Sequence, residues 1–220
     1  MSLYKILKYK LLVAFSGNSA IFITIVHSIC FSFLIAITFK YVGISQIEKS
    51  NVILASSIFI TVFTLILVLD VITQKDLAFN AFDLLIVNNG IKKYLFVANL
   101  IVAFIFSSFL AVFNYFLLLI FIGSIVEFKF LMLMLLILFA FFLAIWGTFF
   151  SALSYKSKSG SVMTYLLYIP IILVGAGLVS HLARIQPSLF FQDQAFFTFI
   201  GITAIGYFLG DSFYMNLIEE

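Results

Sequence analysis

The chain has 220 residues, of which 65% are hydrophobic and 10% are charged, and its formal net charge at pH 7 is +3. A water-soluble domain of this composition would aggregate, so the soluble globular classes are excluded. The few basic residues do not form the clustered surface that nucleic acid requires, which argues against a nucleic-acid partner. The composition indicates an integral membrane protein whose solvent is the lipid bilayer.

The N-terminal segment 1–17 interleaves lysines with apolar side chains. Lys5, Lys8 and Lys10 are separated by leucine, isoleucine and tyrosine. This pattern predicts an amphipathic helix that lies flat at the lipid headgroups. Because anionic lipid attracts lysine whatever the function of a protein, a simple topology anchor is the alternative interpretation.

Six long apolar segments follow, and almost no charged residue lies inside them. A helix needs roughly 20 apolar residues to cross a hydrocarbon core about 30 Å thick. The segments lack the period-2 alternation of barrel strands, so they are predicted to be helices. The predicted spans are 18–39, 51–72, 94–123, 130–153, 161–183 and 196–214. We therefore predict an all-α, polytopic integral membrane protein with six transmembrane helices, in which residues 1–220 form a single transmembrane domain.

The positions of lysine and arginine predict the orientation of the chain, because short loops rich in these residues stay in the cytoplasm. With the N-terminus inside, the cytoplasmic segments hold Lys5, Lys8, Lys10, Lys75, Lys92, Lys93, Lys156 and Lys158. The outer segments then hold Lys40, Lys49, Lys129 and Arg184. An even number of spans places both termini in the cytoplasm.

Two histidines are the candidate contacts for a substrate or for haem. His27 lies in the middle of the first predicted span, one helical turn before Cys30, and an imidazole at this place is able to ligate a metal or a haem iron. The alternative is a neutral imidazole that is hydrogen-bonded to a neighbouring helix. His181 lies near the outer end of the fifth span, beside Arg184, where it either faces an external aqueous site or is an ordinary interfacial residue.

Other polar residues inside the spans are candidates for contacts between helices. Asn99, Asn114, Ser107 and Ser108 all fall in the third predicted span, where they are able to hydrogen-bond across helices or to permit close approach. Pro170 interrupts the fifth span and predicts a bent helix that serves as a hinge, with a static kink as the alternative.

The segment between the second and third spans is predicted to be a short cytoplasmic helix at about 74–88. It contains neither glycine nor proline, and Asp76, Asn80 and Asp83 share one narrow stripe at spacings of four and three. The opposite side is apolar, and Asn88, Asn89 and Gly90 then form a turn signal that ends the helix. The helix either packs against the bilayer surface or docks a cytosolic partner.

Several motifs are absent. The chain has no nucleotide-binding Gly-x-x-x-x-Gly-Lys-[Ser/Thr] loop, no His-Glu-x-x-His and no Gly-x-Ser-x-Gly, so we do not expect an enzyme, and any ATP hydrolysis must occur on a separate subunit. Because Cys30 is the single cysteine, neither a disulfide nor a cysteine-based metal site is available within one chain.

Two stretches of sequence resemble the haem exporter protein B (CcmB) family, the permease of the cytochrome c maturation machinery. In that family the second span ends in an acidic residue, followed by an Arg-Asp-Asp-Leu-like element, by Gly-Ser-Leu-Glu and by a leucine-rich stretch that ends in proline. The corresponding positions here are Asp70, Asp76–Leu77, and Phe82–Asp83 followed by Leu85. The family also has a basic-Gly-Gly-Val-Leu-Leu element before its fifth span and a proline several residues later. This chain has 158–163 and Pro170 at those places, and it departs from the family pattern at Asn80, Asp83, Asn89, Ser161 and Val174.

The resemblance implies the membrane permease of an ABC exporter, present as two copies and paired with a cytosolic ABC ATPase subunit that binds the ATP. The helix at about 74–88 is then the coupling helix. Asp70, Asp76, Asn80 and Asp83 are its ATPase-coupling residues. Further implied partners are a haem-handling membrane protein and a periplasmic haem chaperone, whose haem-loaded form is released when ATP is used. No cofactor is bound firmly, and haem is the candidate substrate.

The implied location is the bacterial inner (cytoplasmic) membrane, with the mitochondrial inner membrane as the alternative. Two other functions stay open at this point. One is a type-2 ABC export permease for lipid, glycan or drug, because the coupling-loop pattern is shared across that superfamily. The other is a membrane scaffold that transports nothing.

Overall fold

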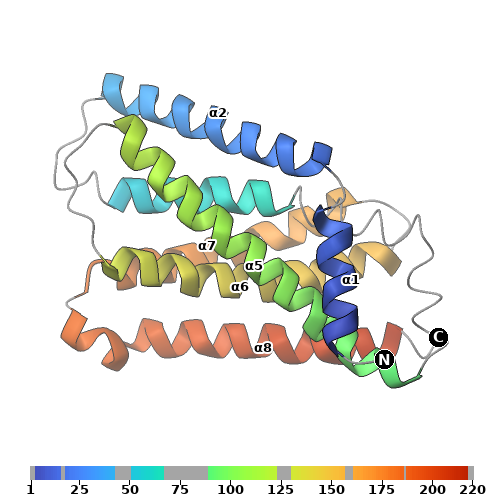
Figure 1. Cartoon of the computed structure of the whole chain (residues 1–220). Coiled ribbons are helices and arrows are strands. Elements are labelled where there is room, and N and C mark those ends of the chain that lie inside the picture. Colours follow the sequence, from blue (N-terminus) through green and yellow to red (C-terminus); the bar gives the residue numbers. More distant parts are fainter. Residues whose placement is uncertain are drawn as a thin grey trace.

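The computed structural model describes residues 3–15, 18–42, 51–66, 89–122, 130–156, 161–185 and 187–217, and in these ranges the chain is helical without any strand. The helices of the bundle are α2 (Asn18–Val42), the helix Asn51–Ile66, which carries no label in Figure 1, α5 (Asn89–Ile122), α6 (Phe130–Lys156), α7 (Ser161–Leu182) and α8 (Gln194–Leu217). They form a bundle in which helices that follow one another in sequence run in opposite directions (Figure 1). The all-α prediction is confirmed for the described residues.

Four of these helices are long and apolar enough to cross a membrane. The stretches of sufficient length and hydropathy are Thr24–Tyr41, Tyr94–Ile122, Phe130–Ser151 and Gln194–Tyr214. Two shorter apolar helices accompany them, Asn51–Ile66 and Tyr168–Leu182. Their lengths and compositions are those of a multi-pass membrane protein.

The centre of the bundle is α6, which packs against α5, α7 and α8. Its sequence is apolar on every side, which is the pattern of a helix that is surrounded by other helices. Phe139, Phe142 and Leu143 are fully buried there, and Trp146 is 6% exposed. On the outer helices large apolar side chains such as Phe22 and Phe208 are exposed, as expected for surfaces that face lipid.

Small residues bring α5 and α6 close together. Ala103, Ser107 and Ala111 recur every four residues on α5, and Ala140, Ala144 and Thr148 do the same on α6, and all of them are buried. The hydroxyl of Ser107 donates a hydrogen bond to the carbonyl oxygen of Ala140 at 2.9 Å, so the two rows meet. Because lipid provides little hydrophobic drive for association, close approach of small residues and hydrogen bonds between helices hold such contacts together.

The N-terminal helix α1 (Leu3–Phe15) lies across one end of the bundle and packs against α5 (Figure 1). Ile6 is 1% exposed in a cluster with residues of α5 and α8, and Leu7 and Leu11 pack beside further residues of α5. The predicted helix is confirmed. Its inner side, however, rests on protein, and this side includes Lys10, which is buried.

One local prediction is wrong. Asn89 and Gly90 belong to the first turn of α5, although the sequence predicted a turn at these residues. Asparagine is favoured at the beginning of a helix as well as in turns, so the same residue type fits both structures. As a result α5 begins five residues before the predicted span at Tyr94.

Candidate functional residues within the bundle and at its end

The helix α2 carries a row of small, mostly polar residues on its buried side. Thr24, Ser28, Ser32 and Ala36 recur every four residues, and each is buried. The helix packs against α5, and the hydroxyl oxygens of Ser28 and Ser32 have no hydrogen-bond partner. Burying a hydroxyl without a hydrogen-bond partner in the membrane interior costs free energy. Packing alone would be served by apolar residues, so the polar residues of this row are candidates for a function.

His27 lies at the border of this row. Its ring centroid lies 4.3 Å from that of Phe31, one turn further along α2, and its Nδ1 atom is buried without a hydrogen-bond partner. The predicted hydrogen bond from the imidazole to a neighbouring helix is therefore not made through Nδ1. Cys30, one turn away, is exposed, and in the described part of the chain no three His, Cys, Asp or Glu side chains lie close enough to hold a metal ion.

Asn114 links α5 to the helix Asn51–Ile66. Its side-chain amide donates a hydrogen bond to the hydroxyl oxygen of Thr61 at 3.2 Å, and Thr61 in turn donates to the carbonyl oxygen of Ser57 at 2.6 Å. Both Asn114 and Thr61 are fully buried, and the Oδ1 atom of Asn114 has no partner. The predicted role of Asn114 in hydrogen bonding across helices is confirmed.

Asn99 links α5 to α8. Its amide nitrogen lies 3.1 Å from the phenolic oxygen of Tyr214, across 115 positions of sequence. Tyr214 also packs against Phe96, with ring centroids 5.3 Å apart. The predictions for Asn99 and Ser107 are thus confirmed as hydrogen bonds across helices, whereas the hydroxyl of Ser108 is buried without a partner.

Pro170 lies inside α7, which continues as one helix through it. Proline has no N–H to donate to the carbonyl four residues earlier, so this turn of the helix lacks one backbone hydrogen bond. Next to it, the buried Tyr168 donates its hydroxyl hydrogen to the carbonyl oxygen of Leu143 on α6 at 2.9 Å. The backbone weakness at Pro170 therefore adjoins a point where α7 is held to α6, and the predicted hinge at Pro170 stays a prediction.

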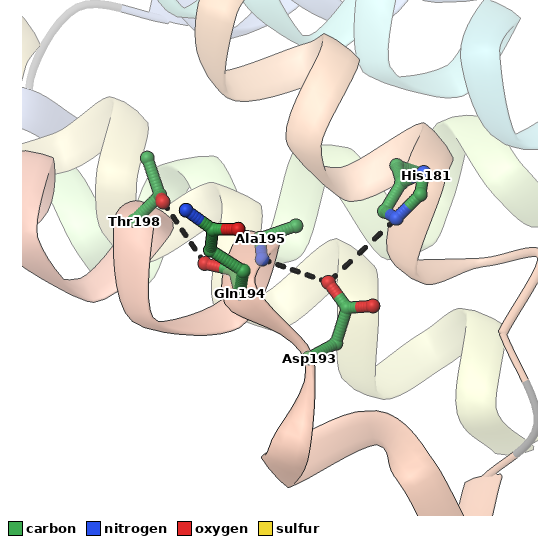
Figure 2. A network of polar contacts seen from close by, with 5 residues as sticks. All are labelled: His181, Asp193, Gln194, Ala195 and Thr198. Atoms are coloured by element: carbon green, nitrogen blue, oxygen red, sulfur yellow. Dashed lines mark hydrogen bonds and ion pairs between the residues drawn. The ribbon is translucent and has the colours of Figure 1, made fainter.

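A second polar group lies where the end of α7 meets the start of α8. The Nε2 atom of His181 lies 3.6 Å from Oδ1 of Asp193, and the same Oδ1 accepts a hydrogen bond from the backbone N–H of Ala195 at 2.7 Å (Figure 2). The 3₁₀ helix η1 (Pro187–Gln192) makes the connection. The side chain of His181 is 59% exposed, and that of Asp193 is 27% exposed.

Asp193 acts as the N-cap of α8, since it immediately precedes Gln194 and binds the N–H of the second residue of the helix. Its negative charge also lies at the positive end of the helix dipole. The contacts of Asp193 are accounted for by the structure of the helix end itself.

Replacing Asp193 with alanine is expected to lower the free energy of unfolding by about 1 kcal/mol, because the N–H of Ala195 loses its acceptor. Asp193→Asn keeps an acceptor oxygen and is expected to cost only a few tenths of a kcal/mol. His181→Ala removes an exposed side-chain contact and is expected to cost less than about 1 kcal/mol. Reversible unfolding in mixed micelles measures all three, and a loss for His181→Ala equal to that for Asp193→Ala would contradict the capping role.

The remaining predicted site residues, Asp70, Asp76, Asn80 and Asp83, lie outside the described residues, as does the predicted helix at about 74–88. The structure gives the two histidines separate surroundings, since His27 contacts Phe31 and His181 pairs with Asp193. Sequence reasoning missed Asp193 and Tyr214 as partners. An aspartate directly before an apolar helix was an available signal for the first, whereas nothing in the sequence marks Tyr214 as the partner of Asn99.

No protein family, no curated protein and no solved structure matches the chain.

Proposed function

We propose that the protein is the membrane permease subunit of an ABC-type exporter that acts in haem handling for c-type cytochrome maturation, with ATP hydrolysed by a separate cytosolic subunit. The resemblance at 70–85 and 158–170 to haem exporter protein B is the observation that carries this proposal. A bundle of apolar helices that run alternately in opposite directions supports it, since a permease must present such a bundle to lipid (Figure 1).

The distribution of charge supports the proposed orientation. Helix α1, which carries Lys5 and Lys8, lies at the same end of the bundle as the C-terminal end of α6, which is Lys156 (Figure 1). The C-terminal end of α2, whose last turn holds Lys40, and the C-terminal end of α7, which Arg184 follows, lie at the opposite end. By the positive-inside rule the α1 end faces the cytoplasm. The end of the helix Asn51–Ile66 and the start of α5 also lie at the α1 end, which is the proposed ATPase side.

In the proposed mechanism, closure of the ATPase pushes on the segment 74–88. The displacement is then transmitted to the helix Asn51–Ile66 and to α5, which flank this segment and are joined by the Asn114–Thr61 hydrogen bond. Helix α5 transmits the displacement to α6 through the contact between their rows of small residues, which include Ser107 and Ala140. Packed elements of this kind transmit motion as rigid bodies. His27 and His181 remain the proposed contacts for haem, each at its own place in the bundle.

Replacing both Asp76 and Asp83 with lysine is expected to abolish coupling, because it reverses two charges on the stripe that is proposed to meet the ATPase. In cells depleted of the native protein, haem-stained gels of membranes are expected to show a loss of covalently bound haem from c-type cytochromes. The wild-type chain restores the haem and the double variant does not. The matched control is Glu219→Lys with Glu220→Lys, which changes the charge by the same amount on the same proposed side and is expected to restore it.

Three results separate the candidate functions. Normal c-type cytochromes after depletion would contradict the haem pathway. An ATPase that is bound and responds to Asp76→Lys with Asp83→Lys, but with cytochromes intact, would indicate a permease for lipid, glycan or drug. Full restoration of haem by the double variant, without any dependence on nucleotide, would indicate a membrane scaffold.

A further inference from the structure

The packing of α1 fixes which of its sides faces outward. Leu3 and Ile6 belong to a cluster with α5 and α8, and Leu7 and Leu11 pack against a second cluster on α5. These residues occur at spacings of three and four, so they form one continuous inner side of the helix. The inner side holds α1 on the bundle, and the helix therefore has a defined outer side.

The outer side is a mixture of basic, aromatic and apolar side chains. Its members are Tyr4, Lys5, Lys8, Tyr9 and Leu12, all of them exposed, and we refer to them as the α1 outer face. Tyr4 is 70% exposed and Leu12 is 60% exposed. Lys5 and Lys8 are three positions apart, which places their side chains as neighbours on the helix surface.

We propose that the α1 outer face binds the headgroups of anionic phospholipids in the leaflet at its end of the bundle. Two neighbouring ammonium groups match a headgroup phosphate, and lysine binds phosphate as a compact positive charge. The tyrosines have the amphipathic rings that are enriched at the level of the headgroups, and Leu12 supplies an apolar contact to the upper acyl chain. The proposal does not depend on the proposed transport function.

The position of α1 favours lipid over an acidic protein as the occupant. The helix lies across the end of the bundle and does not run along α6 and α8, so it follows the membrane surface if those helices cross the bilayer (Figure 1). A helix in this plane has its outer side beside the headgroups. An acidic soluble partner would leave the exposed Leu12 and the ring of Tyr4 without an apolar environment.

Binding at this face also bears on the rest of the bundle. Ile6, on the inner side of α1, shares a cluster with Leu95 and Phe96 of α5 and with Tyr214 of α8. A lipid that holds α1 in place therefore stabilises the contact between α5 and α8 at this end. We expect anionic lipid to raise the thermal stability of the wild-type protein, since a ligand that binds only the folded state stabilises it.

The test uses the full-length protein, purified in mild detergent and equilibrated with equal amounts of phosphatidylglycerol and phosphatidylcholine of the same acyl chains. Native mass spectrometry then measures how much of each lipid stays bound. Lys5→Gln with Lys8→Gln is expected to weaken phosphatidylglycerol binding about 30-fold, because each lysine near an anionic surface contributes about 1 kcal/mol. Lys40→Gln is the matched control, since Lys40 is exposed at the opposite end of the bundle, and it is expected to change binding less than about twofold.

A second variant separates charge from folding. Lys5→Arg with Lys8→Arg keeps both positive charges and is expected to retain the phosphatidylglycerol, and the thermal stability in phosphatidylcholine alone should be the same for every variant. Unchanged phosphatidylglycerol binding in the glutamine variant would overturn the proposal. The proposal would also be overturned if the wild type retained the two lipids equally and the glutamine variant instead lost a bound acidic protein. This result would assign the α1 outer face to a protein partner.

Discussion

Alanine in place of Phe142 is expected to destabilise the bundle by about 2 kcal/mol. Phe142 is fully buried on α6. The centroid of its ring lies 5.2 Å from the ring centroid of Phe199 on α8 and 5.9 Å from that of Phe139. Lipid tails are as apolar as the protein interior, so the loss comes from packing and not from transfer out of water. Removing on the order of 100 Å³ of side chain, at about 24 cal/mol for each Å³ of cavity, gives this value.

The matched control is the next residue towards the N-terminus. Phe141 has the same side chain but is 38% exposed, and it touches Phe104 of α5 edge to face. A lipid chain is able to fill the space that Phe141→Ala leaves, so no cavity results and the expected change is within about 0.5 kcal/mol. Reversible unfolding in mixed micelles of a detergent and a denaturing surfactant measures both variants. Equal losses in the free energy of unfolding for the two variants would contradict the prediction that the burial of Phe142 stabilises the bundle.

Replacing Gly206 with alanine is expected to lower the free energy of unfolding by about 1–3 kcal/mol, the usual cost of overfilling a packed interior. The added Cβ would lie 2.7 Å from Cε2 and 2.9 Å from Nε1 of Trp146 on α6. These atoms belong to the rigid fused ring of a side chain that is 6% exposed and that also packs against Phe150. Helix α8 would therefore have to move away from α6.

Gly201 on the same helix gives the opposite expectation. A Cβ at this position meets no atom within 4 Å, so Gly201→Ala adds no overlap. Alanine is the better helix former, and the substitution is expected to stabilise the protein by about 0.5–1 kcal/mol. The same unfolding assay compares the two variants, and a change of the same sign at Gly201 and Gly206 would contradict the close contact between α8 and Trp146.

The helices could be predicted from the sequence because hydropathy and the positions of polar residues define where a helix begins. Helices α2, α6 and α7 begin at the predicted residues Asn18, Phe130 and Ser161. The beginning of α5 was missed at Asn89, since asparagine followed by glycine is compatible with a turn and with a helix start. Lipid-crossing segments are long and uniform, and this makes their existence easier to predict than their ends.

The partners of the candidate residues could not be predicted in the same way. Asn114 and Asn99 were predicted to hydrogen-bond across helices, but the choice of Thr61 and Tyr214 depends on how the helices rotate and cross. The same holds for the glycines, since Gly175 lies against the ring of Phe142 while Gly177, two positions on, meets no atom within 4 Å. The spacing of residues along a helix predicts which of them share a face, whereas the residues that this face contacts follow only from the packed structure.

The packing of α2 against α5 has a consequence for the synthesis of the protein. Helix α2 leaves the ribosome before α5, the helix against which it packs, and the end of α5 follows the end of α2 only after residues 43–122 have been made. At about 5–20 residues per second this interval lasts on the order of ten seconds. During it α2 is without the contact to α5 that it makes in the finished bundle. Helix α2, the first helix after α1, is therefore unable to complete its packing until α5 has been made.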